Sequence, residues 1–152
     1  MQMLLDHLSA DRVLLEGRAR DKRGVLRELA EVLSEGSGDD QVQAVLAGLT
    51  ERENVMSTGI GHGIAIPHAR LAGAGELKLA LVLYPAGIDF EALDGKPIHA
   101  AFGVVGPPEG TGQHVKLLAR IARLVKETGA LDEVLGASDA ETVLSILERR
   151  DQ

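Results

Sequence analysis

The chain has 152 residues, of which 45% are hydrophobic and 26% charged, and its net charge is −7 at pH 7. This length and composition predict one globular domain over residues 1–152 and argue against disorder. The acidic balance disfavours duplex DNA or an anionic membrane as a partner. Aromatic residues make up only 2% of the chain, which disfavours stacking on single-stranded nucleic acid. The absence of cysteine excludes a disulfide framework, a thiolate metal site and a cysteine nucleophile.

The N-terminus, Met1–His7, has neither the basic start nor the apolar run of a secretory signal. No stretch approaches the roughly 18 apolar residues of a membrane span. The sequence therefore predicts a cytoplasmic protein with no direct membrane insertion.

Apolar periodicity and turn residues predict the following elements in the first third of the chain. They are a short helical segment at 3–8, a strand at 12–15, a helix at 21–35 capped by Asp21, a glycine-rich break at 36–38 and a helix at 39–53. The charged run Arg18–Arg23 is interpreted as a solvated turn and helix start.

The remainder predicts a strand, glycine turn and strand within 57–66, then strands at 77–84 and 98–105. A loop at 106–110 leads to a helix that ends near residue 127, and a final helix covers 140–149. Strands mixed with helices predict an α/β sandwich, in which a mixed, mostly buried sheet is flanked by helices.

The unusual segment is Gly59–His68, which contains glycine at positions 59, 61 and 63. A dinucleotide-binding loop would have to open a helix. An apolar run and Pro67 follow instead, and this disfavours that function. P-loop and Gly-x-Ser-x-Gly motifs are absent from the sequence.

His68 is the first candidate for chemistry. Pro67 favours an extended geometry just before it, which is expected to place His68 at the end of a short buried strand. The neighbouring glycines are expected to let another molecule approach closely. A neutral imidazole is a competent nucleophile. From spacing alone, a packed histidine that is satisfied by a carbonyl group is the favoured interpretation.

His114 is the second candidate. It shares a helical face with apolar residues at the third, fourth and seventh following positions, and therefore points inward from the positive end of the helix dipole. The alternative is a first-turn histidine that helps to cap the helix. A zinc site of His62, His68 and His114 is disfavoured, because the spacing between His62 and His68 matches no common ligand pattern and no carboxylate is forced to join them. No metal is expected, and no cofactor is expected either.

Together these segments resemble the enzyme IIA components of the bacterial phosphoenolpyruvate-dependent phosphotransferase system, in the fructose/mannitol class that includes the nitrogen-regulatory type. The resemblance covers essentially the whole chain. The segments that carry it are Arg52-Glu53, Ser57–Gly61, Gly63–His68, Gly87–Phe90, Asp94–Pro97 and the helix that contains His114.

The resemblance implies that His68 accepts a phosphoryl group on Nε2 and that His114 hydrogen-bonds this group. It also implies that Arg52 binds phosphate oxygens, a contact suited to its guanidinium, and that Ser57 and Thr58 supply hydroxyl groups. The sequence departs from the pattern at His62, where relatives usually carry a small polar residue such as Asn.

By the same resemblance, the chain is a phosphotransferase with a phosphohistidine intermediate. Its donor would be a histidine phosphocarrier protein (HPr or a nitrogen-type homologue). Its acceptor would be an enzyme IIB in sugar uptake, or the phosphorylation state would regulate a transporter or kinase. A regulatory interaction domain without phosphoryl relay is the alternative.

Overall fold

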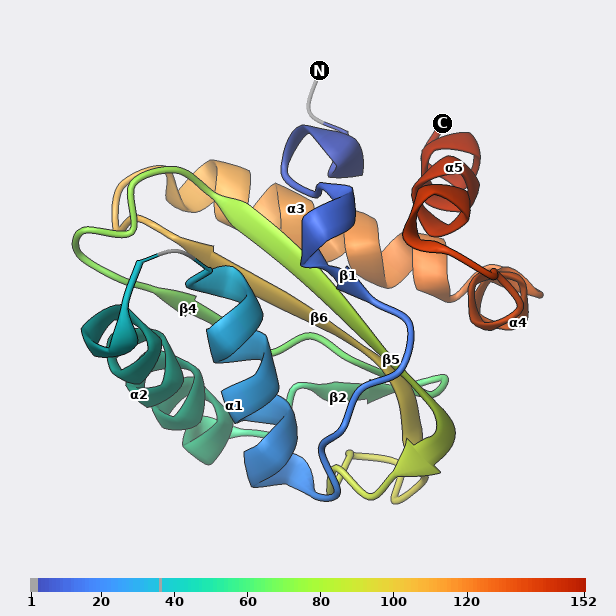
Figure 1. Cartoon of the computed structure of the whole chain (residues 1–152), viewed down its shortest axis with the longest axis horizontal. Helices are drawn as coiled ribbons and strands as arrows, with labels where there is room; N and C mark the ends of the chain where they lie inside the picture. The colour runs from blue at the N-terminus through green and yellow to red at the C-terminus, as the bar shows by residue number, and fades with distance from the viewer. Residues whose placement is uncertain (1–2, 36) are drawn as a thin grey trace.

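The computed structural model describes residues 3–35 and 37–152 and shows an α/β fold (Figure 1). Two short 3-10 helices, η1 (Leu4–Asp6) and η2 (Ala10–Arg12), open the chain. The strands are β1 (Val13–Leu14), β2 (Gly59–Gly61), β3 (Ile64–Ala65), β4 (His68–Arg70), β5 (Lys78–Ile88) and β6 (Ile98–Gly106). The α-helices are α1 (Lys22–Leu33), α2 (Asp39–Val55), α3 (Thr111–Val125), α4 (Ala130–Leu135) and α5 (Ala140–Arg150).

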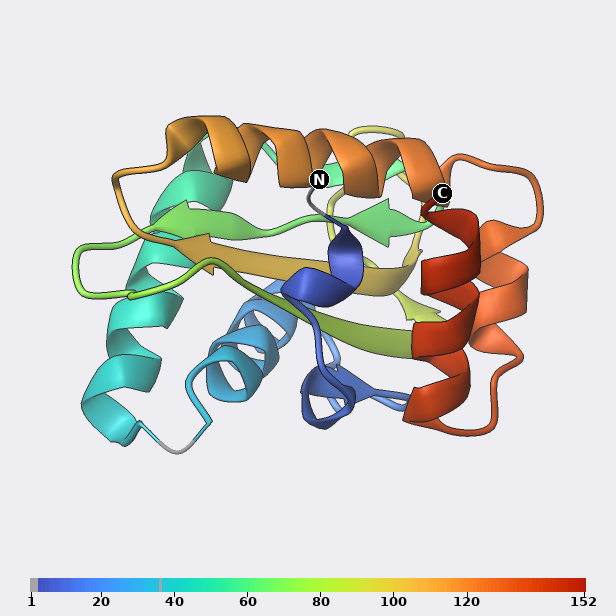
Figure 2. The same cartoon turned by 90° about the horizontal axis from the view of Figure 1, so that it is seen from above.

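The six strands form one mixed sheet, in which five follow the order β1-β5-β6-β3-β2 and β4 pairs with β6 off this path. The two long strands, β5 and β6, pair antiparallel at its centre. The other side of β6 is shared by two short parallel strands: β3 pairs near its beginning and β4 near its end. Seen from above, α3 covers one face of the sheet, and α1 and α2 cover the other (Figure 2).

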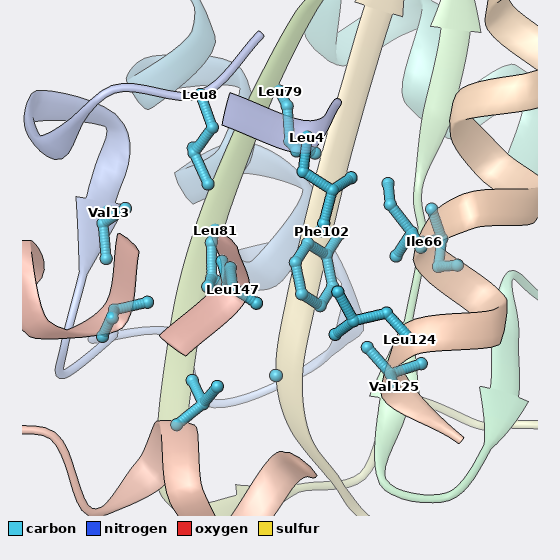
Figure 3. Packing of buried hydrophobic residues seen from close by; sticks show 14 of the residues in the cluster. Leu4, Leu8, Val13, Ile66, Leu79, Leu81, Phe102, Leu124, Val125 and Leu147 are labelled. Carbon is cyan, nitrogen blue, oxygen red and sulfur yellow. The ribbon is translucent and has the colours of Figure 1, made fainter. Parts of the chain in front are cut away.

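Both faces of the sheet are buried because helices cover each of them, and side chains alternate between the two faces along each strand. On β5, the odd positions 79, 81 and 83 belong to the core shared with α3, α4 and α5 (Figure 3). The even positions 80, 82 and 84 belong to the core shared with α1 and α2. This explains why residues 77–84 are nearly continuously apolar.

The structure confirms the predicted fold class and most of the predicted elements. Asp21 caps α1 as expected, since its Oδ1 accepts a hydrogen bond from the Gly24 N–H at 2.8 Å. Helix α4 is an addition, and β5 runs on to Ile88. Gly36, in the predicted break after α1, lies outside the described residues. Among the described residues, no helix combines the length and apolarity needed to cross a membrane.

The expectation that His68 ends a strand is wrong. It begins β4, which pairs with β6 through His68 opposite Val104. Pro67 interrupts the edge of the sheet only briefly, because its carbonyl accepts a hydrogen bond from the Val104 N–H at 3.0 Å. A proline lacks only the N–H, so the ladder can resume directly after it.

The glycines before His68 allow close packing within the chain, contrary to the expectation that they admit another molecule. A Cβ on Gly59 would lie 2.6 Å from the Ala92 side chain, and one on Gly63 would lie 2.9 Å from Leu131. Gly61 and Gly63 also have positive φ values of 91° and 77° in the turn between β2 and β3.

Candidate functional site

The fold brings His68 and His114 together from β4 and the first turn of α3. Their ring centroids are 5.7 Å apart and the rings are tilted by 59°. They lie in an open hollow of about 480 Å³ between α2, β4 and α3. Its other lining residues are Gly48, Glu51, Arg52, Val55, Ala69, Arg70, Leu71, Val115 and Leu118.

The backbone fixes the tautomer of His68. Its Nδ1 lies 2.7 Å from the carbonyl oxygen of Ile66. A carbonyl oxygen can only accept a hydrogen bond, so Nδ1 carries the proton and the lone pair resides on Nε2. The ring is therefore held in the form that presents Nε2 as a nucleophile.

The surroundings also keep His68 neutral. Burial lowers its pKa below the usual value, and the nearby positive charges of Arg52 and Arg70 act in the same direction. The hydrogen bond to Ile66 and the charge of Glu53 oppose this shift only in part. At neutral pH, the nucleophilic form is therefore the populated one.

His114 points inward, as the helical periodicity predicted. It is 4% exposed, and neither ring nitrogen has a hydrogen-bond partner within the described chain. Burial lowers its pKa to about 4, with smaller contributions from His68 and Arg70. Buried polar atoms are normally paired, so two unpaired nitrogens beside a hollow are a feature of binding sites rather than of a packed core. In the described chain, the His114 side chain makes no hydrogen bond that would cap the helix, so the alternative role as a helix cap is not supported.

Two arginines bring positive charge to the hollow. Arg52, in the last turn of α2, donates to the Met56 carbonyl at 3.0 Å and lines the hollow with His68. Arg70 lies two residues after His68 on β4 and donates to Thr111 Oγ1 at 2.8 Å. The sequence left Arg70 unassigned, although the period of two in a strand would have placed it on the same face as His68.

The two candidate hydroxyl groups are engaged differently. Thr58 is buried, and its Oγ1 donates to Glu53 Oε1 at 2.6 Å. Ser57 Oγ accepts a hydrogen bond from the Gly59 N–H at 3.1 Å, which leaves its own proton available. Neither residue lines the hollow around the two histidines.

His62 lies outside this group. It is exposed in the turn between β2 and β3 and has a positive φ of 58°. Across residues 3–35 and 37–152, the structure shows no group of three or more His, Cys, Asp or Glu side chains arranged to hold a metal ion.

Two histidines that share a hollow with two arginines suit a phosphoryl group. Residues 6–150 match the family described as phosphoenolpyruvate-dependent sugar phosphotransferase system, EIIA 2. The chain belongs to this EIIA family. The family match confirms the resemblance that the sequence motifs indicated.

Similar EIIA-family proteins include both regulatory and sugar-specific members. A nitrogen regulatory protein of Pseudomonas aeruginosa is 33% identical over 140 residues, which is 92% of this chain and 91% of that protein. A fructose-specific EIIABC component of Bacillus subtilis is 29% identical over 95% of this chain and 23% of its own length.

Solved structures of EIIA proteins share the fold. The nitrogen regulatory protein IIA-Ntr of Neisseria meningitidis has a TM-score of 0.86 at 30% identity and covers 93% of this chain and 97% of its own. The mannitol IIA of Escherichia coli has a TM-score of 0.74 at 20% identity, over 92% of this chain and 98% of its own.

Proposed function

We propose that the protein is a phosphohistidine carrier of the phosphotransferase system, in which His68 accepts a phosphoryl group on Nε2. One observation carries the proposal. His68 Nδ1 donates a hydrogen bond to the Ile66 carbonyl oxygen, and the two atoms are 2.7 Å apart. The Nε2 lone pair is therefore free in a hollow shared with His114. Family membership supplies the reaction class.

In the proposed step, Nε2 of His68 attacks phosphorus in line with the P–N bond of a phosphohistidine on the donor protein. A new P–Nε2 bond forms, the donor P–N bond breaks, and its electron pair returns to the donor imidazole. The Nδ1 proton stays in place, and the Ile66 carbonyl stabilises the charge that develops on the phosphorylated ring. Such transfer depends mainly on positioning and on stabilising the phosphoryl oxygens.

The other site residues act on the transferred group. Arg52 and Arg70 supply positive charge from two sides of the hollow. Neutral His114 has one N–H that can donate to a phosphoryl oxygen, and it has no competing partner in the described chain. Neither candidate hydroxyl group lines the hollow, and that of Thr58 already donates to Glu53, so the contacts to the phosphoryl group are assigned to Arg52, Arg70 and His114 rather than to Ser57 or Thr58.

The partners proposed are a histidine phosphocarrier protein as donor and an enzyme IIB as acceptor. Two exposed apolar side chains line the hollow, Val55 at 78% and Val115 at 55%, and Met56, which follows Val55 in the chain, is 59% exposed. Exposed apolar groups around a charged centre are suited to brief docking of another protein. A solved complex of mannitol IIA with phosphorylated IIB from Escherichia coli has the same fold as this chain, with a TM-score of 0.73 at 20% identity.

The test is the intact mass of the chain after incubation with phosphoenolpyruvate, enzyme I and the histidine phosphocarrier protein. The wild type should gain one acid-labile phosphoryl group, and His68→Ala should gain none. His62→Ala is the matched control, since it removes an exposed imidazole outside the hollow. Normal phosphorylation of His68→Ala would overturn the site assignment.

A second candidate is regulation, in which phosphorylated His68 controls binding to a target protein and no enzyme IIB follows. The observation in its favour is that relatives at 33% and 31% identity are nitrogen regulatory proteins. Mixing the phosphorylated chain with IIB proteins of fructose and mannitol systems separates the two. Rapid loss of the phosphoryl group to one of them supports relay, and a stable phosphorylated chain with every IIB supports regulation.

A further inference from the structure

The partly buried Lys22 and the buried Glu53 form an ion pair that the proposed chemistry does not use. The Glu53 side chain is 3% exposed, and its Oε2 lies 2.9 Å from Lys22 Nζ. The same carboxylate accepts hydrogen bonds from the backbone N–H of Thr58 at 2.9 Å and from its hydroxyl at 2.6 Å. The Lys22 ammonium also lies 5.1 Å from the ring centroid of Phe90. Lys22 is therefore not simply part of a solvated charged run, as the sequence suggested.

Both charges stand at the unfavourable end of their helices. Lys22 is the first residue of α1, where the helix dipole repels a cation. Glu53 is in the last turn of α2, where the dipole repels an anion. Both residues thus oppose the charge preference of their helix ends and are nevertheless paired with each other. Such a departure from local preference indicates that the pair serves another part of the molecule.

An unbroken series of hydrogen bonds leads from this ion pair to His68. Glu53 holds both the N–H and the hydroxyl of Thr58. The Thr58 carbonyl accepts the N–H of Ile66 at 2.9 Å. The Ile66 carbonyl then accepts the Nδ1 proton of His68 at 2.7 Å. The group that sets the tautomer of His68 is thus fixed in place by the Glu53 carboxylate.

We propose that Lys22 and Glu53 are positioning residues for phosphoryl transfer: their ion pair anchors Thr58, and Thr58 in turn holds the Ile66 carbonyl that orients His68. This inference rests on the proposed function of His68 as the phosphoryl acceptor. Neither residue touches the phosphoryl group. Their effect reaches the reaction through the angle and tautomer of one imidazole ring.

The Lys22 charge is essential to this arrangement. A carboxylate that is buried without its counter-charge is strongly disfavoured, so loss of the ammonium draws Glu53 towards solvent or towards protonation. Either change releases the two hydrogen bonds to Thr58. A displacement of about 1 Å at a reacting group is enough to slow a transfer step ~100-fold.

The chain contains a matched control for a purely structural role. Arg120 and Asp151 form a second ion pair whose side chains are 20% and 1% exposed, against 19% and 3% for Lys22 and Glu53. The Asp151 carboxylate also accepts a backbone N–H, that of Leu4, at 2.8 Å. This second pair holds the chain ends together and makes no hydrogen bond to the histidines.

The absence of cysteine allows a direct test of the Lys22 charge. Lys22→Cys introduces the sole thiol of the chain. Alkylation with 2-bromoethylamine rebuilds a side chain of lysine length with its ammonium, and alkylation with 2-bromoethanol builds one of the same length without charge. Lys22 lines an open cavity between α1 and α2, so both reagents can reach the thiol in the folded protein.

Two measurements are made on each form. The first is the tautomer of His68, from the ¹⁵N shifts and long-range couplings of its ring. The second is the rate of phosphoryl transfer from the histidine phosphocarrier protein, separated into kcat and KM. Glu53→Gln, which preserves shape without charge, and Arg120→Met, which breaks the control pair, are measured alongside.

We expect the wild type and the aminoethylated form to show His68 protonated at Nδ1 and to agree in kcat within ~2-fold. The hydroxyethylated form and Glu53→Gln should show mixed tautomers and a kcat at least ~10-fold lower at unchanged KM. The Arg120→Met variant should be less stable than the wild type, while the tautomer of His68 and kcat stay unchanged. Equal kcat and tautomer in the charged and uncharged alkylated forms would overturn the inference.

The tautomer measurement separates this inference from the proposed function. If no donor phosphorylates the wild type, the proposed function fails. The positioning of His68 is then tested by its ring tautomer in the variants alone. If the wild type is phosphorylated but His68 keeps its Nδ1 proton in every variant, the inference fails and the proposed function stands.

Discussion

Replacing His114 by leucine should stabilise the protein, and increasingly so as the pH falls. His114 is 4% exposed, and both of its ring nitrogens lack partners in the described chain. An unsatisfied buried polar group costs about 1–3 kcal/mol. Leucine has a similar volume and no polar atoms, so His114→Leu should be more stable than the wild type at neutral pH by about 1 kcal/mol or more.

The pH dependence follows from the lowered pKa of His114, which burial brings from 6.5 to about 4. Between these values the unfolded chain binds a proton that the folded chain does not, so stability falls as the pH drops below the unfolded value. The linkage relation for these two pKa values gives a loss of about 2 kcal/mol between about pH 7 and pH 5. His114→Leu lacks this loss, and its advantage should therefore grow by that amount.

Urea unfolding, followed by far-UV circular dichroism, measures this difference for both proteins at the two pH values. Circular dichroism is the suitable signal because the chain has one tyrosine and no tryptophan. Other acid-sensitive groups are common to both proteins and cancel in the comparison. An advantage that stays constant between pH 7 and pH 5 would refute the assignment of a neutral, buried His114. Under the proposed function, the stabilised variant should nevertheless transfer phosphoryl groups more slowly.

Three further predictions concern the surroundings of the two histidines. Arg70→Ala should slow phosphorylation of His68 while changing the free energy of unfolding by at most about 0.5 kcal/mol. The effect on stability is small because the side chain is exposed and its hydrogen bond to Thr111 is at the surface. Equal rates of the variant and the wild type in a phosphorylation time course would contradict this. His62→Asn should leave both phosphorylation and stability within error, since asparagine tolerates the φ of 58° at this exposed turn; a changed rate in the same assay would show that His62 acts in the site. Gly106→Ala should destabilise the protein by about 1–3 kcal/mol in urea unfolding, because the new Cβ would lie 2.7 Å from Leu77 Cδ1; a neutral effect would show that Leu77 repacks freely.

Much of the fold was predictable because its signals are local. The helix that contains His114 repeats apolar residues every three to four positions, which fixed both the element and the inward direction of His114. The continuous apolar run at 77–84 indicated a central strand covered on both faces, and β5 is such a strand. Strand β4 was missed because three residues after a proline carry too short a pattern to recognise.

The sequence alone therefore determined most of the elements, the fold class and the family, since periodicity and the Gly-rich segment before His68 are properties of neighbouring residues. Tertiary structure decided the geometry with which the groups meet and the partners that the sequence did not indicate. His68 and His114 approach to 5.7 Å although they are far apart in the chain. The ion pair of Lys22 with Glu53 likewise joins distant segments that no motif marked. Thr58 shows most clearly what the sequence could not predict. Its position suggested a phosphate ligand, yet its hydroxyl donates a hydrogen bond to the buried Glu53. Hydrogen-bond partners depend on distance in space, which sequence spacing does not encode.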